Sequence, residues 1–120
     1  MSVIVGISAD CDYMLENAGY RVLMEIASAR TDRQEDKRAL EEGAWAHFLD
    51  LPRLEPGQAR RIAWLLDEAA QVRIEDWLEQ GTEASLAGAA YYVAFQSLLQ
   101  EAFGRPPVTA SPSDETPLGD

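Results

Sequence analysis

The segment between Glu83 and Glu101 contains no charged residue, although the chain as a whole is rich in charge. Following Thr82 as a candidate N-cap, it is patterned as a helix that is apolar on nearly every side, and such a helix is usually covered by neighbours. A chain of 120 residues can provide that cover by packing its other elements around one core. We therefore expect the segment to be the central helix of a bundle.

A membrane span is the alternative interpretation of the same segment. Its length is close to the roughly 20 residues that a span needs. However, Ser85, Gln96, Ser97 and Gln100 dilute its apolar character, and no flanking basic clusters would orient it in a bilayer. The sequence favours a buried helix, and we expect no membrane-spanning segment.

Apolar periodicity divides the rest of the chain into three more helices. It predicts one over residues 12–30, a second over 31–49 and a third over 56–80, which ends at Gly81. The proline-containing turn between the second and third helices blocks helix continuation. Because all connections are short, we expect neighbouring helices to run antiparallel.

Residues with known capping roles mark the ends of these helices. Asp10 or Asp12 is the expected N-cap of the first helix. Thr31 followed three residues later by Gln34 matches a capping box for the second. Pro56 suits the first turn of the third helix.

These segments predict an all-α protein, a compact bundle of about four helices. Residues 3–7, which are apolar and mostly β-branched, are expected to form a short extended N-terminus. The segment 105–120 is rich in proline and has no apolar period, so we expect a disordered, flexible tail. The predicted domain organisation is a helical domain at 1–104 followed by this tail.

Helical periodicity also predicts which side chains are buried. On the second helix, the residues that offer a face to the core are Leu40, Ala44, Trp45, Phe48 and Leu49. On the third helix, Arg73 lies inside the apolar arc. An unpaired buried guanidinium is costly, so we expect Arg73 either to reach solvent or to meet a carboxylate.

The chain is strongly acidic, with 21 Asp and Glu against 10 Lys and Arg and a net charge of −11. The excess is not confined to the C-terminal segment. A negative surface repels phosphate groups and anionic lipids, so we expect no direct binding to nucleic acid and no membrane binding. A basic protein is the partner that this charge favours, although solubility alone is an alternative explanation.

No group of residues is arranged for catalysis or metal binding. His47 is the only histidine and has no ligand at helical spacing, and Cys11 lies between two acidic residues that disfavour its thiolate. We find no nucleophile elbow and no phosphate-binding loop. We therefore expect no enzyme activity, no metal and no cofactor. A single cysteine and an N-terminus without basic residues favour a cytoplasmic protein.

One cluster of carboxylates on the third helix suggests a binding surface. At about 100° per residue, Glu68, Glu75 and Glu79 fall on one side, with Asp76 at the edge and Trp64 bordering them. Such a ridge is mildly destabilising, and a large aromatic beside acids is a frequent interface anchor. We expect these five residues to bind a basic partner; a merely solvated face is the alternative.

Three functions remain compatible with the sequence. The leading one is a stoichiometric inhibitor that neutralises a basic bacterial toxin or effector. It would be similar in kind, though in no motif, to immunity proteins and antitoxins. The second is a chaperone or adaptor for a secreted effector, a homodimer formed through the fourth helix. The third is a small helical enzyme or ligand-binding domain with a pocket between helices.

Overall fold

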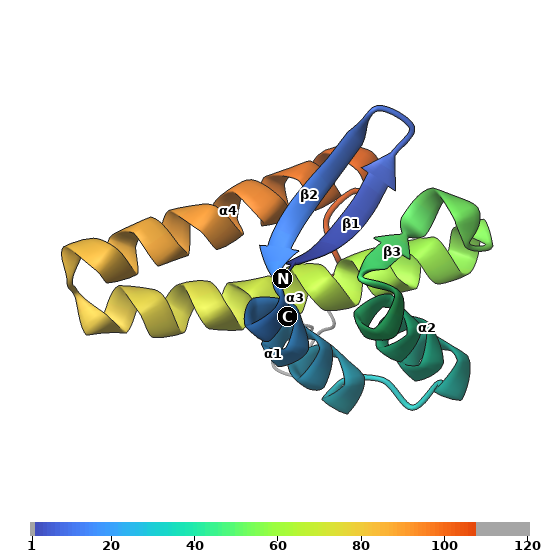
Figure 1. The fold of residues 1–120 in the computed structure, drawn as a ribbon, viewed down its shortest axis with the longest axis horizontal. Helices are drawn as coiled ribbons and strands as arrows, with labels where there is room; N and C mark the ends of the chain where they lie inside the picture. Colours follow the sequence, from blue (N-terminus) through green and yellow to red (C-terminus); the bar gives the residue numbers. More distant parts are fainter. Residues whose placement is uncertain (1, 108–120) are drawn as a thin grey trace, which may run out of the picture.

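The computed structural model describes residues 2–107, in which all four predicted helices are present (Figure 1). Of the predicted tail at 105–120, residues 108–120 lie outside the described part. The helices are α1 (Asn17–Ala29), α2 (Gln34–Ala46), α3 (Pro56–Gln80) and α4 (Glu83–Phe103), and the strands are β1 (Ser2–Ser8), β2 (Cys11–Glu16) and β3 (Phe48–Asp50), followed by a 3-10 turn at Leu51–Arg53.

The predicted all-α fold is confirmed only in part: the structure is mostly helical with four helices, but it also contains a three-stranded sheet in the order β2-β1-β3. The predicted extended N-terminus is its middle strand. β1 pairs antiparallel with β2 and parallel with β3. The β-branched residues Val3 and Val5 are fully buried, which gives β1 one face in the core.

Strand β2 replaces the predicted first turn of the first helix. Its burial alternates: Tyr13 and Leu15 face inward, whereas Asp12, Met14 and Glu16 are exposed. That is the period of two expected of a strand with one buried face. This strand was not predicted, because Leu15 also fits the apolar arc of the helix that follows it.

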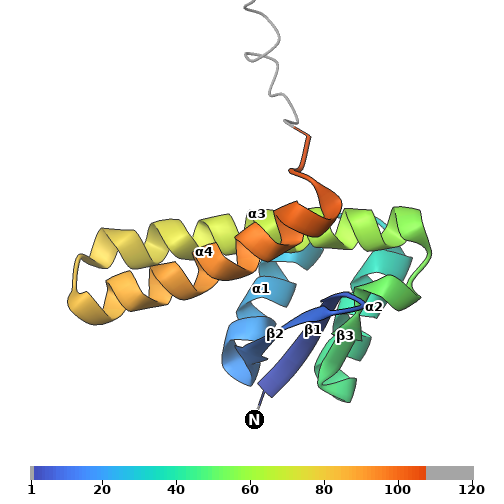
Figure 2. The ribbon, with the colours of Figure 1, turned by 90° about the horizontal axis from the view of Figure 1, so that it is seen from above.

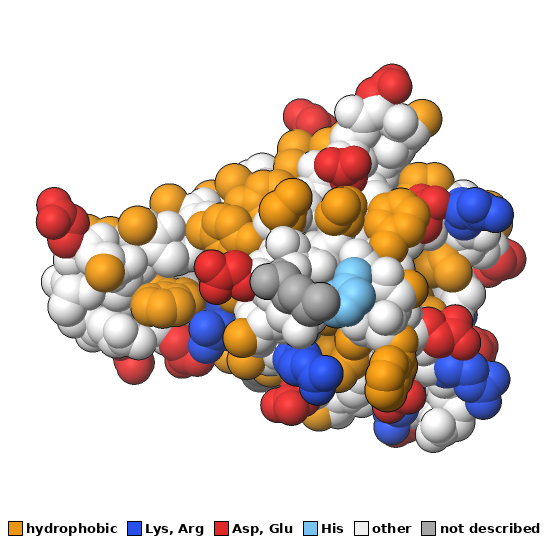
Figure 3. Space-filling view, in the orientation of Figure 1, with side chains coloured by type: hydrophobic (Ala, Val, Ile, Leu, Met, Phe, Trp, Pro, Cys, Tyr) orange, Lys and Arg blue, Asp and Glu red, His pale blue; other side chains and the backbone are white. Residues whose placement is uncertain are grey.

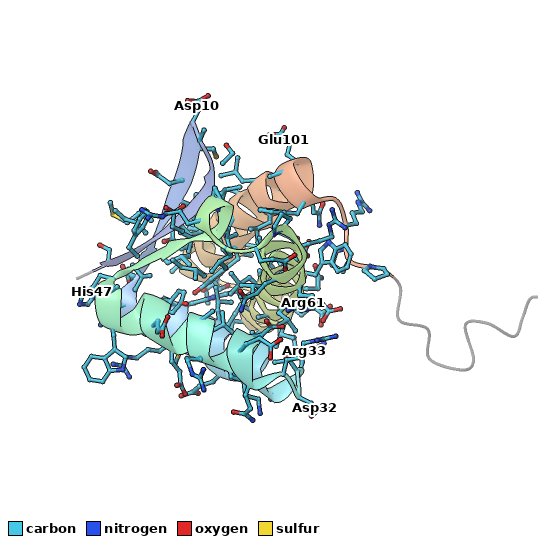
Figure 4. All side chains as sticks on the ribbon, turned by 90° about the vertical axis from the view of Figure 1, so that its right-hand side faces the viewer. Asp10, Asp32, Arg33, His47, Arg61 and Glu101 are labelled. Carbon is cyan, nitrogen blue, oxygen red and sulfur yellow. The ribbon has the colours of Figure 1, made fainter. Side chains whose placement is uncertain are left out.

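Helix α1 therefore begins at Asn17, and neither Asp10 nor Asp12 is its N-cap. The N-cap is Glu16, whose side chain makes no capping hydrogen bond. The turn between β1 and β2 carries Asp10 to the tip of the hairpin, far from the helix (Figure 4).

The second helix is shorter at both ends than predicted. α2 begins at Gln34 with Arg33 as N-cap, and Thr31 Oγ1 instead accepts a hydrogen bond from the N–H of Arg33 at 3.2 Å. At its C-terminus, His47 adopts a left-handed conformation with φ 58°. The His47 carbonyl then accepts a hydrogen bond from the N–H of Ile4 at 3.0 Å, which starts the parallel pairing of β3.

The predicted burial of Trp45 and Phe48 is wrong. Trp45 is 86% exposed and Phe48, now on β3, is 46% exposed. α2 buries a narrow face that carries Leu40 and Gly43, and Trp45 points away from that face. The single exposed tryptophan therefore does not belong to the core.

The third and fourth helices begin and end as predicted. Pro56 opens α3, and Gly81 ends it in the left-handed conformation with φ 69°, which suits a residue without Cβ. The Thr82 hydroxyl accepts a hydrogen bond from the N–H of Ser85 at 3.0 Å and so caps α4. α3 and α4 form an antiparallel pair.

Two layers make up the molecule, with α3 and α4 on one side and the sheet, α1 and α2 on the other (Figure 2). The α3 and α4 halves nearest Gly81 extend beyond the sheet, and we call this projection the arm (Figure 1). The core between the layers is formed mainly by buried aliphatic and aromatic side chains, including Val3, Val5, Leu15, Tyr20, Leu23, Leu40, Ile62, Leu66, Phe95 and Leu99.

α4 is not the central helix that the sequence predicted. Only one of its faces is buried, the face that carries Tyr92, Phe95 and Leu99. On the opposite face, Leu86 is 53% and Val93 is 44% exposed. Among residues 2–107, no helix is long and apolar enough to cross a membrane.

Candidate functional site

The acidic ridge predicted on α3 is divided between two environments. Glu75, Asp76 and Glu79 are exposed on the arm. Glu75 accepts a hydrogen bond from Gln71 Nε2 at 3.2 Å, and within residues 2–107 these three carboxylates form no ion pair. They form the open part of the ridge.

Glu68 and Trp64 lie apart from these three residues. Glu68 pairs with Arg30 of the α1 C-terminus at 3.6 Å. Trp64 is half-buried in a cleft of about 210 Å³ that Pro106 also lines. Since the chain leaves α4 on the side away from the sheet (Figure 2), this cleft lies on that side. The two residues thus belong to a locally neutralised cluster.

Arg61 completes that cluster. Its Nε and a terminal nitrogen donate to the two carboxylate oxygens of Asp36 at 2.9 and 3.1 Å, which joins α3 to α2 (Figure 4). Asp36 has no exposed surface. The hydrogen bond to Asp36 is the main cause that raises the pKa of Arg61. This pair is structural.

The solvent-facing side of the sheet carries an apolar row across all three strands. Ile4 on β1 is aligned with Met14 on β2 and with Phe48 on β3. Because the N–H of Ile4 points to β3, Ile4 and Met14 form a non-hydrogen-bonded pair, in which side chains approach most closely. Met14 is 58% exposed, so the row is open to solvent.

Carboxylates border this row on both sides. Asp12 and Asp50 are both aligned with Gly6, and Glu16 is aligned with Ser2. No strand of this sheet contains Lys or Arg. We call the surface formed by the apolar row and these three acids the sheet face; Figure 3 shows apolar side chains with acidic ones around them in this region.

Gly6 is required at the centre of the sheet face. A Cβ at this position would lie 3.0 Å from Asp50 Oδ1 and 3.5 Å from a ring carbon of Phe48. The Asp50 carboxylate would have to shift slightly to admit this Cβ, whereas its distance from the Phe48 ring is an ordinary contact. The glycine thus allows the carboxylate and the ring to lie over the middle strand.

Two tyrosines fix β2 against α4. Tyr13 donates a hydrogen bond to the carbonyl of Tyr91 at 2.8 Å, and Tyr91 donates one to the carbonyl of Met14. Desolvation by burial raises the pKa of both phenols, so both remain neutral donors at neutral pH. The second bond also occupies an outward carbonyl of the edge strand.

A recess lies where the arm leaves the body, next to the sheet face. Its volume is about 330 Å³, and we call it the aromatic notch. Glu16 belongs to both surfaces, which makes them continuous. The notch is lined by Glu16, Gly19, Trp77, Ala87, Gly88, Tyr91 and Tyr92.

Arg73 is held by the rings behind this notch. Its guanidinium carbon lies 5.4 Å from the centroid of the Trp77 ring and 5.6 Å from that of Tyr92. These are cation–π distances. Arg73 is partly exposed, in agreement with the expectation that it reaches solvent, and its contacts with two rings from different helices were not predicted from the sequence.

His47 and Cys11 are not brought together. Cys11 lies on β2 and is partly buried, whereas His47 lines a cleft of about 430 Å³ between α1 and α2, together with Asn17, Arg21 and Trp45. Among residues 2–107, no group of three or more His, Cys, Asp or Glu could hold a metal ion.

Neither the sheet face nor the aromatic notch was predicted from the sequence. The signal for β2 was present, since Tyr13 and Leu15 alternate with Asp12, Met14 and Glu16. Comparison with known proteins adds no assignment: no family model, no curated protein and no solved structure matches this chain.

Proposed function

We propose that this protein binds one basic protein and blocks it stoichiometrically, in the manner of an immunity protein or antitoxin. The observation that carries the proposal is the sheet face, an exposed apolar row bordered by three carboxylates on strands without a basic residue. Exposed apolar side chains ringed by polar ones are typical of protein interfaces. The charge selects a cationic partner.

The two parts of this surface have different tasks. Met14, Ile4 and Phe48 supply the apolar contact, and apolar anchors at the centre of an interface provide much of its affinity. The net charge of −11 attracts a basic partner over long range. In this proposal Glu75, Asp76 and Glu79 on the arm add to that attraction, whereas Glu68 and Trp64 do not contact the partner.

A double substitution tests the sheet face. Met14→Ser with Phe48→Ser removes two exposed anchors, and we expect it to weaken binding at least tenfold. The ligand is the product of a toxin-like gene beside this one, or a basic protein captured from the native host. The matched control is Leu86→Ser, which removes an equally exposed apolar side chain from α4. Unchanged binding by the double variant would remove the sheet face from the interface, and a wild-type protein that neither binds nor neutralises the basic protein would refute the proposal.

A second variant tests the contribution of the arm. Replacing Glu75, Asp76 and Glu79 by their amides should slow association at low salt and leave dissociation nearly unchanged, because charges outside the contact act mainly on the encounter. Stopped-flow association at two salt concentrations measures this. An association rate equal to that of the wild type at low salt would remove the arm from the mechanism.

A homodimer formed through α4, as in an effector chaperone, is a second candidate. The exposed face of α4 that carries Leu86 and Val93 favours it, since uncharged faces are where two acidic copies can approach. Sedimentation at micromolar concentration tests it. A dimer that Leu86→Ser dissociates supports this candidate, and a wild-type monomer excludes it.

A further inference from the structure

The rings around the aromatic notch already hold one cation. Trp77 and Tyr92 contact the guanidinium of Arg73 at cation–π distances. Arg73 is absent from the residues that line the notch, which are Glu16, Gly19, Trp77, Ala87, Gly88, Tyr91 and Tyr92. Arg73 therefore leaves the recess open, and aromatic surface remains for a second cationic group.

The residues that line the notch carry one charge, which is negative, and the guanidinium of Arg73 lies behind the same rings. Glu16 is the only charged lining residue, and this side chain is exposed and makes no capping hydrogen bond. A carboxylate beside aromatic rings is the combination that recognises a guanidinium or ammonium group. The basic partner inferred above would bring such groups to the sheet face, which shares Glu16 with the notch.

Two glycines allow the aromatic side chains of the notch to lie close to the helices. A Cβ on Gly88 would lie 2.9 Å from the Trp77 ring, and a Cβ on Gly19 would lie 2.8 Å from Tyr92 Oη. The rings can therefore lie against bare helix backbone. The volume of about 330 Å³ is at the lower end for ligand pockets, which suits one long side chain better than a large molecule.

We infer that the aromatic notch receives a single Arg or Lys side chain of the basic partner. The aliphatic stem would lie along Tyr91 and Trp77, and its charged end would pair with Glu16. This inference rests on the proposed function and deepens it, because it assigns the partner's side chain a place next to the apolar row.

Small probes test the notch without the partner. The probes are N-acetyl-arginine amide and N-acetyl-lysine amide, with N-acetyl-glutamine amide as the uncharged control. The readout is the indole N–H signal of each tryptophan in ¹H–¹⁵N NMR spectra. We expect the cationic probes to shift the Trp77 signal in a saturable way, while Trp45 and Trp64 serve as internal references away from the notch.

Substitutions then locate the binding. Glu16→Gln should weaken the probes several-fold, whereas the matched control Glu25→Gln, an exposed acid on α1, should not. Gly88→Ala should also weaken them, because the added methyl group displaces the Trp77 ring. Since Glu16 is exposed and makes no side-chain cap, Glu16→Gln should fold normally. Equal shifts with the glutamine probe, or none at Trp77, would overturn the inference.

The outcomes separate this inference from the proposed function. If Met14→Ser with Phe48→Ser abolishes partner binding but Glu16→Gln leaves it unchanged, the notch assignment is wrong and the proposed function stands. If the probes bind the notch while the wild-type protein binds no basic protein, the proposed function is wrong. The notch would then be a site for a free small cation, and the assignment to a partner side chain falls with it.

Discussion

Tyr13 on β2 and Tyr91 on α4 connect these two elements through two hydrogen bonds that run in opposite directions. The Tyr13 hydroxyl donates to the carbonyl of Tyr91 at 2.8 Å, the Tyr91 hydroxyl donates to the carbonyl of Met14, and the ring centroids are 5.3 Å apart. The pair positions Met14, a member of the apolar row, relative to the aromatic notch. The candidate site is therefore built on rigid contacts.

Removing either hydroxyl should destabilise the protein. We expect Tyr13→Phe to lower the free energy of unfolding by about 1 kcal/mol, and Tyr91→Phe by less, because its bond is exposed to water. The double variant should show coupling, since the two residues are in contact. Urea unfolding of all four proteins measures this. Additive losses would show that the two bonds act independently.

The helical part of this fold follows from local signals. Pro56, Gly81 and Thr82 mark helix ends through their backbone conformation or their capping hydroxyl, which need no knowledge of tertiary contacts. β2 was not predicted, because a segment of six residues can fit both the helical period and the period of two of a strand. Its strand conformation is decided by pairing with β1, a tertiary contact that no local pattern contains.

The candidate site was less predictable than the fold, for the same reason. Ile4, Met14 and Phe48 are distant in sequence, and only the register of three strands makes them neighbours. Glu75 and Glu79 are both exposed on α3, and their role as binding residues stays a prediction. Helical geometry could not reveal that Arg30, at the end of another helix, would pair with Glu68.

Arg61 should be far more important for stability than its exposed neighbour Arg60. Arg61→Met leaves the carboxylate of the fully buried Asp36 without its ionic partner. Breaking a buried ion pair costs about 3–5 kcal/mol; because the Arg61 side chain is 32% exposed, we expect about 2–3 kcal/mol.

The matched control for this test is Arg60→Met, which we expect to change the free energy of unfolding by less than about 0.5 kcal/mol. Replacing both partners, Asp36→Leu with Arg61→Met, should recover much of the loss, because no buried charge remains. Chemical denaturation distinguishes these variants. A loss for Arg61→Met no larger than that for Arg60→Met contradicts the structural role.

Tyr20 should make stability depend on alkaline pH. It is fully buried, and its hydroxyl donates to the carbonyl of Leu40 at 2.8 Å. Burial strongly raises the pKa of this phenol above its ordinary value of 10.0. The folded protein thus retains a proton that the unfolded chain loses, so its contribution is complete below pH 10 and decreases above it, by up to about 1.4 kcal/mol per pH unit.

Tyr20→Phe isolates this effect. At neutral pH the variant should be less stable by about 1 kcal/mol, because it lacks the buried hydrogen bond. Above pH 10 the wild type should lose stability faster than the variant, and the difference between them should shrink. Comparing the two proteins removes the contributions of Tyr13 and Tyr91, whose pKa values are raised in both. Parallel pH profiles would contradict the assignment.

Asp67 is a buried carboxylate that accepts hydrogen bonds from two side-chain amides. It is 4% exposed and accepts hydrogen bonds from Gln96 Nε2 at 2.9 Å and from Gln100 Nε2 at 3.1 Å, which join α3 to α4. Asp67→Asn keeps the shape but turns one acceptor into a donor that faces another donor. We expect this variant to lower the free energy of unfolding by about 1–2 kcal/mol.

Asp76→Asn, on the exposed part of the same helix, should change the free energy of unfolding by less than about 0.5 kcal/mol. Thermal unfolding compares the two, and equal values would mean that the carboxylate of Asp67 is not needed to join the helices.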